Sequence, residues 1–281
     1  MAAEEAVKTF LQNKLDKKIV FITSGGTRVP LEKNAVRFID NFSMGTRGAA
    51  SAEFFLSHGY AVVFFHREES LQPFARNYPR LFYSLQIKDD QVVCDLPHLK
   101  EDVANYHKYK DNLLFVTFTT LQQYLHLLEN ISHLLESRGT EAMLYLAAAV
   151  SDFYVQHEKM PTHKIQSNEG NLNLTLSIVP KKLDSIVNEI CPKAFVVSFK
   201  LETDESILID KARGALVKYG HQLVIANLLE TRKAKVTLVE KDSTELVQMS
   251  QDELDSGKYI EEKIVARLVE IHDNFIKMNK K

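Results

Sequence analysis

The chain has no tryptophan and little cysteine or glycine. Its 281 residues include two cysteines, Cys94 and Cys191, and ten glycines, which is roughly half the usual share of glycine. The two cysteines lie far apart and show no metal-ligand spacing, so the sequence indicates neither a disulfide framework nor a zinc site. Such cysteine usage is typical of a reducing compartment.

Long apolar runs and a charge imbalance are also missing. No run approaches the ~20 apolar residues that a membrane helix needs. The first residues, Met-Ala-Ala-Glu-Glu-Ala, have neither the basic nor the apolar region of a signal peptide. The formal net charge is −2, so no global field attracts nucleic acid. We therefore expect a cytoplasmic protein with no nucleic-acid partner and no membrane partner.

Several common catalytic motifs are absent as well. The sequence has no Gly-x-Gly-x-x-Gly, which argues against a nicotinamide-dependent oxidoreductase. It has no Gly-x-x-x-x-Gly-Lys-Ser/Thr, which excludes a P-loop enzyme. It has no Gly-x-Ser-x-Gly either, so a hydrolase of the nucleophile-elbow type is not indicated.

The few glycines that are present gather in one window. Between residues 24 and 48 lie Gly25, Gly26, Gly45 and Gly48. Four cationic residues share this window with few acids: Arg28, Lys33, Arg37 and Arg47. Glycine-rich loops that lead into a helix bind phosphate through backbone amides, and guanidinium groups add charge. An anion or nucleotide site is therefore favoured over two tight turns with solvated arginines.

Strands alternate with helices along the whole chain. Lys18–Ile22 reads as a buried strand, 49–59 as a helix and Tyr60–Phe65 as the next strand, which together form a βαβ unit. Further strands are expected at 113–119, 142–150, 172–179, 194–199, 223–226 and 236–239. Further helices are expected at 4–13, 100–110, 121–138, 182–190, 205–219 and 260–275.

This pattern predicts one α/β domain over residues 1–281. The expected fold is a modified Rossmann-like, mostly parallel sheet with helices on both faces. Residues 67–112 read as an insertion, either a lid or a dimer arm. The basic tail at about 277–281 is expected to be frayed.

Polar residues follow several of these strands. They lie at 24–27, 151–152 and 200–203, and Asn227 follows a fourth strand. The carboxyl ends of parallel strands share one edge of the sheet, so these residues are expected to converge on one site.

The sequence also resembles a known family. The stretches that carry the resemblance are Ser24–Thr27, Val36–Ser43 with Gly45 and Gly48, Ala147–Phe153, His163–Ser167 and Phe199–Thr203. Their order is similar to that of the phosphopantothenoylcysteine synthetases, in the eukaryotic stand-alone form, from about Lys18 to the final helix. The resemblance implies a homodimeric ligase of coenzyme A biosynthesis. Such a ligase joins 4′-phosphopantothenate to L-cysteine with ATP or CTP, through an acyl nucleotidylate, and releases pyrophosphate and AMP or CMP.

The resemblance also implies roles for individual residues. Phosphate binding falls to Gly25, Ser43, Gly45 and Gly48, and sugar and base contacts fall to Phe199 and Asn227. The phosphopantothenate would contact Asn41, Ala148, Ala149, Asp152 and, from the partner subunit, Arg37. Asn41 and Lys164 are the expected catalytic residues. Mg²⁺ should accompany the triphosphate through oxygen ligands and waters, without a metal site made of protein side chains.

Some features depart from the family pattern. Bacterial members carry Lys-x-Lys-Lys where this chain has Lys164-Ile165-Gln166-Ser167, and Met44 stands where the family often has serine. A non-catalytic nucleotide-binding homologue that regulates a partner is kept as the alternative, although the presence of Asn41, Asp152 and Lys164 together argues against it. The choice between ATP and CTP stays open, as do the cysteine-binding residues and any association with other coenzyme A enzymes.

Overall fold

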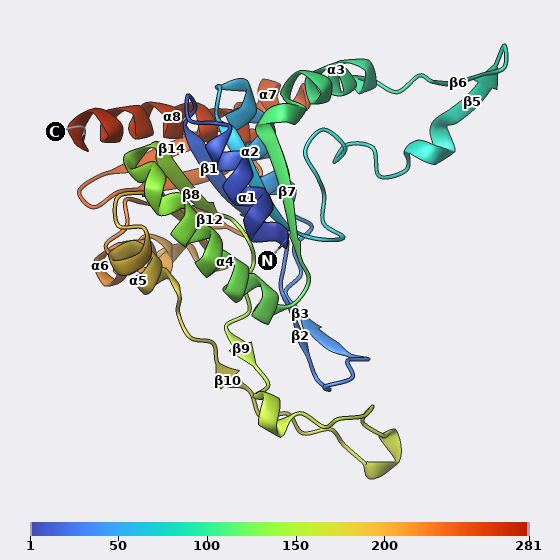
Figure 1. Ribbon diagram of the computed structural model, residues 1–281, viewed down its shortest axis with the longest axis vertical. Helices are drawn as coiled ribbons and strands as arrows, with labels where there is room; N and C mark the ends of the chain where they lie inside the picture. Colours follow the sequence, from blue (N-terminus) through green and yellow to red (C-terminus); the bar gives the residue numbers. More distant parts are fainter. Residues whose placement is uncertain (1, 280–281) are drawn as a thin grey trace.

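The computed structural model describes residues 2–279. An eight-stranded sheet runs through its centre in the order β14-β13-β12-β11-β8-β1-β4-β7 (Figure 1). The strands of this sheet are β1 (Ile19–Ser24), β4 (Ala61–Arg67), β7 (Leu113–Phe118), β8 (Ala142–Leu146), β11 (Phe195–Glu202), β12 (Leu223–Leu228), β13 (Lys235–Val239) and β14 (Thr244–Gln248). The six strands from β7 to β12 in this order are parallel, and β13 and β14 are antiparallel.

Helices cover both faces of this sheet. The α-helices are α1 (Ala2–Gln12), α2 (Thr46–Ser57), α3 (Leu99–Tyr109), α4 (Leu121–Leu135), α5 (Leu183–Ser185), α6 (Leu208–Tyr219), α7 (Gln251–Asp255) and α8 (Ile260–Asn279). A π-helical turn, Ile186–Ile190, continues α5. Short 3-10 turns lie at Leu81–Ser84, Lys110–Asn112, Glu136–Glu141, His157–Lys159, Ser167–Glu169 and Glu205–Ile207.

The strand residues divide between the two layers as their alternation predicts. Val20 and Ile22 of β1 belong to the core under α2 and α8, and Ile19 and Phe21 belong to the core under α1 and α4. All six residues of β1 are buried. The mostly parallel α/β sandwich is therefore confirmed, and its order reverses direction between β1 and β8, which is where such sheets bind ligands.

Three small hairpins lie outside the central sheet. They are β2 (Arg28–Pro30) with β3 (Phe38–Asp40), β5 (Leu85–Lys88) with β6 (Gln91–Cys94), and β9 (Phe153–Tyr154) with β10 (Ser177–Ile178). The β5–β6 hairpin belongs to the predicted insertion and projects far from the sheet, whereas the arm, residues 153–179, projects from another side (Figure 1). The insertion also contains the predicted helix, as α3.

Some expected elements differ from the structure. The strand expected at 172–179 is wrong, because only Ser177–Ile178 has a neighbouring strand to pair with. The strand expected at 142–150 ends at Leu146. The helix α8 continues to Asn279, so the tail is not frayed from Lys277, and Lys280 and Lys281 lie outside the described residues. No helix within residues 2–279 is both long and apolar enough to cross a bilayer.

A buried histidine ties α8 to the sheet and carries a pH prediction. His272 is fully buried, with Nδ1 2.8 Å from the Tyr60 hydroxyl and Nε2 2.9 Å from the carbonyl oxygen of Thr140. Burial lowers the pKa of His272 from 6.5 to about 4. The unfolded chain therefore takes up a proton between these values that the folded chain does not. Going from pH 7 to pH 5 should lower the free energy of unfolding by about 2 kcal/mol through this ring.

Urea denaturation at both pH values measures this loss. His272→Gln should make stability less dependent on pH, whereas a matched change of the exposed His126 should leave the dependence as it is. Equal losses in His272→Gln and in the unaltered protein would contradict the prediction.

Candidate functional site

The turn after β1 runs beside the chain that follows β8. The amide of Ala149 donates to the carbonyl oxygen of Gly25 at 2.8 Å, and the amide of Thr27 donates to the carbonyl oxygen of Ala149 at 3.1 Å. Both segments leave the sheet at the point where its order reverses. The predicted convergence of these two strand ends is therefore confirmed.

Two threonine hydroxyls hold this junction together. The hydroxyl of Thr23 accepts a hydrogen bond from the amide of Ala148 at 3.1 Å, and that of Thr27 accepts one from the amide of Ser151 at 3.0 Å. Neither hydroxyl was predicted from the sequence as part of the site. The signal that could have found them is the pair of threonines that flank Ser24-Gly25-Gly26.

Asn41 is fixed against the same turn by its backbone. Its amide donates to the carbonyl oxygen of Thr27 at 3.1 Å. A Cβ atom on Gly26 would lie only 1.7 Å from the carbonyl oxygen of Asn41. Glycine at position 26 therefore allows a backbone contact that any other residue would prevent.

The start of α2 completes the arrangement. Gly45 precedes this helix in the left-handed conformation, with φ 79°, and no side chain caps the helix. The hydroxyl of Ser24 donates to the carbonyl oxygen of Gly45 at 3.1 Å, and Gly48 of the first helical turn packs on Ser24. Uncapped amides at a helix start attract anions. We call residues 24–27, 41–48 and 147–151 the cradle.

Beside the cradle lies a network of paired charges. Arg28 donates to Glu69 at 2.8 Å and to Asp40 at 3.4 Å, and Arg67 donates to Asp40 at 2.6 Å. The hydrogen bond to Glu69 raises the pKa of Arg28. The carboxylates therefore neutralise Arg28, which the sequence had suggested for phosphate binding. Arg28 and Arg67 in turn hold Asp40, the residue directly before Asn41.

Arg37 lies at the other end of the β2–β3 hairpin, paired with the buried Glu32. Its guanidinium donates to Glu32 at 2.8 Å, and the same carboxylate accepts hydrogen bonds from the backbone amides of Val36 and Arg37. Burial raises the pKa of Glu32, but the hydrogen bonds from Arg37 and the backbone outweigh it, so the pKa lies below its ordinary value. Glu32 therefore orders the tip of the hairpin as a carboxylate.

The hairpin tip in turn holds the arm. The amide of Lys33 donates to the carbonyl oxygen of Pro161 at 2.9 Å, and that of Asn34 donates to the carbonyl oxygen of Thr162 at 3.1 Å. Arg37 also donates to the carbonyl oxygen of Ile165 at 3.3 Å. One hairpin thus connects the cradle to the arm.

Comparison with known proteins shows the family. A family model described as the DNA/pantothenate metabolism flavoprotein C-terminal domain matches residues 115–270. The human phosphopantothenate–cysteine ligase is 46% identical over 273 residues, which cover 92% of this chain and 88% of that protein. The chain belongs to the phosphopantothenate–cysteine ligase family. The CAB2 ligase of Saccharomyces cerevisiae is 43% identical over 292 residues, which cover 94% of this chain and 78% of that protein.

Solved structures agree with this family. A Cab2 mutant in complex with phosphopantothenate-cysteine matches with a TM-score of 0.88 and 42% identity, over 99% of this chain and 94% of that chain. The DNA/pantothenate metabolism flavoprotein from Streptococcus pneumoniae shares the fold, with a TM-score of 0.63 and 24% identity, over 92% of this chain and 99% of that chain.

The structure brings most of the site residues expected for a phosphopantothenate–cysteine ligase to the cradle. Those within it are Gly25, Asn41, Ser43, Gly45, Gly48, Ala148 and Ala149. Phe199 lies in the middle of β11, with the centre of its ring 5.9 Å from the Arg47 guanidinium at the start of α2. Asn227 is buried inside β12. The prediction that it follows this strand is therefore wrong.

Three further expected residues lie outside the cradle. Asp152 directly follows it and pairs with Lys181. Arg37 and Lys164 lie together where the hairpin tip meets the arm, because Arg37 donates to the residue after Lys164. No hydrogen bond joins either of them to the cradle of the same chain within the described residues.

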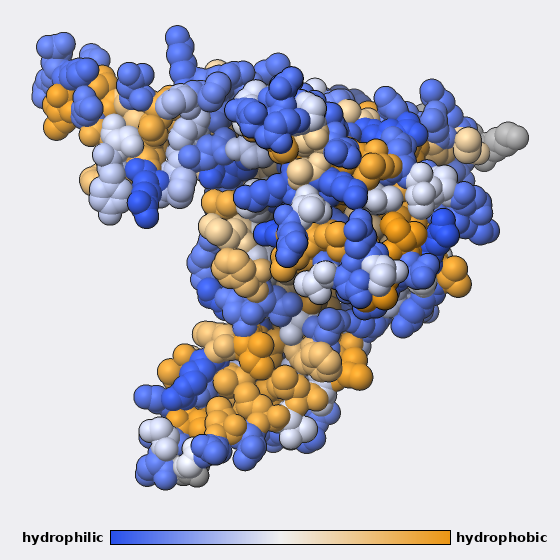
Figure 2. Space-filling view, turned by 180° about the vertical axis from the view of Figure 1, so that it is seen from behind, coloured by the Kyte–Doolittle hydropathy of each residue, from blue (hydrophilic) through white to orange (hydrophobic). Residues whose placement is uncertain are grey.

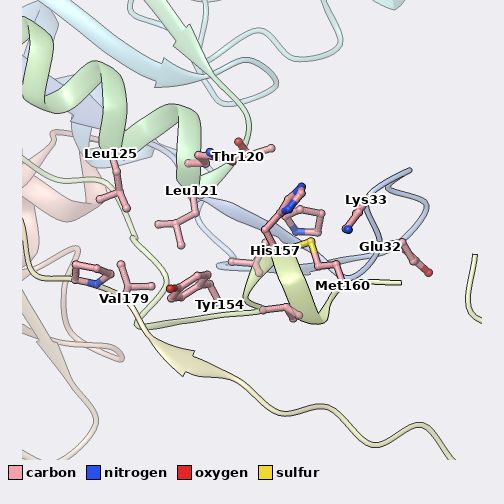
Figure 3. Close-up of a pocket in the computed structure, with 14 residues that line it drawn as sticks. Glu32, Lys33, Thr120, Leu121, Leu125, Tyr154, His157, Met160 and Val179 are labelled. Atoms are coloured by element: carbon pink, nitrogen blue, oxygen red, sulfur yellow. The ribbon is translucent and has the colours of Figure 1, made fainter. Parts of the chain in front are cut away.

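A cavity of about 460 Å³ lies between the β2–β3 hairpin, the start of α4 and the base of the arm (Figure 3). Its walls are mainly apolar and include Leu121, Leu125, Tyr154 and Val179. None of the expected site residues lines it. The oriented amides and close glycine contacts lie in the cradle, so we assign the site there.

Residues 2–279 also contain no group of three or more His, Cys, Asp or Glu side chains that could hold a metal ion.

Proposed function

We propose that the protein joins 4′-phosphopantothenate to L-cysteine in a reaction driven by ATP or CTP. The observation that carries this proposal is the cradle, where the uncapped start of α2 lies beside the fixed Asn41 and the chain after β8. The names of the relatives at 43–46% identity support the same substrates and the same amide product. They give no support to the non-catalytic alternative.

In the first step, a carboxylate oxygen of phosphopantothenate attacks the α-phosphorus of the nucleotide and pyrophosphate leaves. We assign the nucleotide phosphates to the amides of Gly25, Ser43, Gly45 and Gly48. These amides stabilise negative charge as it shifts between phosphate groups, without adding protein charge that must reorganise. A magnesium ion that accompanies the nucleotide would supply further charge stabilisation.

In the second step, the cysteine amine attacks the acyl carbon. The nucleoside monophosphate leaves with the electron pair of the broken acyl–oxygen bond, and the attacking nitrogen loses a proton. We assign the acyl nucleotidylate to Asn41, whose uncharged amide donates a hydrogen bond to it. Ala148, Ala149 and Asp152 contact the pantothenate, and Phe199 and Asn227 contact the nucleoside. Lys164 offsets negative charge during the first step.

We propose a homodimer in which Arg37 binds the substrate phosphate of the neighbouring subunit. The arm supports this proposal because it exposes an apolar series at Leu172, Leu174, Leu176 and Ile178. Figure 2 shows the hydrophobic residues gathered on this part of the surface. Exposed apolar patches of this kind mark contact surfaces, and a second copy would cover them.

The decisive experiment is pyrophosphate release by the purified protein with Mg²⁺, 4′-phosphopantothenate and either ATP or CTP, with and without L-cysteine. We expect cysteine-dependent turnover, and the ratio of the two rates gives the nucleotide preference. A folded protein that releases no pyrophosphate with either nucleotide would overturn the proposal in favour of a regulatory homologue.

The change Asn41→Asp should separate the two steps. A carboxylate at this position repels the acyl nucleotidylate, and loss of one donor to such a group lowers a rate by about 10²-fold. A single burst of pyrophosphate should remain, while formation of phosphopantothenoylcysteine slows. Quenched-flow assays of both products check this, and an unchanged steady-state rate would refute the role of Asn41.

A further inference from the structure

Arg47 forms a buried contact that the proposed mechanism does not use. It is the second residue of α2, and its side chain turns away from the helix start toward α8. Its guanidinium donates to Glu261 in the first turn of α8 at 3.0 Å and to the carbonyl oxygen of Arg232 at 2.6 Å. The side chains of Arg47 and Glu261 are 16% and 8% exposed. Both terminal nitrogens of Arg47 are thus already engaged within the protein.

Arg47 joins α2 to the turn that follows one of the proposed nucleoside contacts. Arg232 belongs to the turn 229–234, which connects β12 to β13 and begins two residues after Asn227. The amide of Leu229 in this turn donates to the carbonyl oxygen of Glu202 on β11 at 3.0 Å. Through its hydrogen bond to Arg232, Arg47 connects the same turn to the start of α2, beside Phe199.

The Phe199 ring also packs against a second aromatic ring. It packs edge-on against Tyr145 with ring centroids 5.0 Å apart, and the hydroxyl of Tyr145 lies 2.9 Å from that of Ser51 on α2. Arg47 therefore adds a connection that Tyr145 does not make, because its guanidinium joins α2 to the carbonyl oxygen of Arg232 in the turn 229–234.

A buried ion pair is a poor source of stability, because desolvation of both groups offsets their attraction. The fixed geometry of the Arg47 side chain, by contrast, holds α2, α8 and the turn 229–234 in one arrangement. We propose that Arg47 is the positioning residue for the nucleoside side of the site: it holds the turn 229–234 against α2, with Glu261 fixing its guanidinium. The inference rests on the proposed function, since it takes Phe199 and Asn227 as nucleoside contacts.

Two substitutions of Arg47 separate positioning from charge. Arg47→Lys keeps the positive charge but cannot contact Glu261 and Arg232 together through a planar fork. Both Arg47→Lys and Arg47→Met should weaken ATP binding by about tenfold, since small displacements at a site have effects of this size or larger. AMP binding should weaken by the same factor, because the nucleoside side of the site is affected. Titration calorimetry with ATP, CTP and AMP gives these dissociation constants without turnover.

A second pair of variants separates positioning from stability. Arg47→Met leaves Glu261 buried without its partner and should lower Tm, whereas Arg47→Met with Glu261→Gln should recover much of that Tm. Nucleotide affinity should stay low in the double variant, because the turn is still not held. Glu262→Gln, at the exposed neighbouring position, is the matched control and should change neither Tm nor affinity.

Three results would overturn the inference. They are native ATP affinity in Arg47→Lys, a loss confined to the triphosphate, and an affinity that recovers together with Tm in the double variant. The proposed function is judged separately, by cysteine-dependent turnover of the unaltered protein, so the two can fail independently.

Discussion

Gly26→Ala should reduce turnover by about 10³-fold or more, although the substitution adds one methyl group. That carbon would lie 1.7 Å from the carbonyl oxygen of Asn41, so the loop or the turn must move by more than an ångström. Displacements of about 1 Å at a reacting centre already lower rates by about 10²-fold. Here the movement affects both Asn41 and the turn that carries Gly25. Initial rates with saturating nucleotide and phosphopantothenate measure the loss.

Gly214→Ala is the matched control for this prediction. Gly214 lies inside α6, where an added Cβ meets no atom within 4 Å. Alanine favours the helix over glycine by about 1 kcal/mol, so this variant should keep full activity and unfold at a slightly higher temperature. Near-native activity in folded Gly26→Ala would show that the loop adapts, and would remove Asn41 from the mechanism as described.

The second large effect concerns the proposed subunit sharing of the site. Arg37→Gln and Asn41→Ala should each be nearly inactive alone, but co-expression of the two chains should restore about a quarter of full activity. About half of the dimers are then mixed, and in each mixed dimer one site combines an intact Asn41 with an intact Arg37 from the partner. Activity per mole of total protein, purified through one affinity tag that both chains carry, measures the recovery.

Two controls sharpen this test. Co-expression of Asn41→Ala with Gly26→Ala should restore nothing, because both changes affect the cradle and every site then carries one of them. Arg37→Gln should still fold its hairpin, since Glu32 keeps its hydrogen bonds from backbone amides. Failure of Arg37→Gln and Asn41→Ala to complement, or a fully active Arg37→Gln, would argue against a site shared between subunits.

The sequence predicted those parts of the fold that local pattern determines. The run Val20-Phe21-Ile22 became the fully buried β1, and the helical spacing of Leu121, Tyr124 and Leu128 became α4. The pattern of Leu172, Leu174 and Leu176 was wrong for a different reason. Alternation favours a strand only where a neighbouring strand accepts its hydrogen bonds, and this segment has none within the described chain.

Some elements were missed although the sequence carries a signal. The helix α7 starts with a capping box formed by Ser250 and Glu253, which is visible in the sequence. The strand β14 and the β5–β6 hairpin were missed because each depends on pairing with its neighbour more than on its own composition.

The candidate site likewise has parts that the sequence predicted and parts that it did not. The glycine positions predicted where backbone amides would gather, because glycine reports on backbone geometry. The partners of the arginines could not be predicted, because Glu261 is far from Arg47 in the sequence and nothing local marks the pair. The pairing of Glu32 with Arg37 was easier to predict, since Glu32 is one of only two acids among the cations of the glycine window.

The central position of β1 also affects how the molecule is made. β1 pairs on one side with β4, which follows soon after it, and on the other side with β8, which begins only at Ala142. Contacts between residues so distant in the chain form slowly, because a long loop must close before they yield any stabilisation. During synthesis, the turn at Gly25 therefore lacks its hydrogen bonds to the chain after β8 until the ribosome has passed Ala149. A nascent chain shorter than this holds the glycines and Asn41, yet it lacks the strand end against which they are fixed.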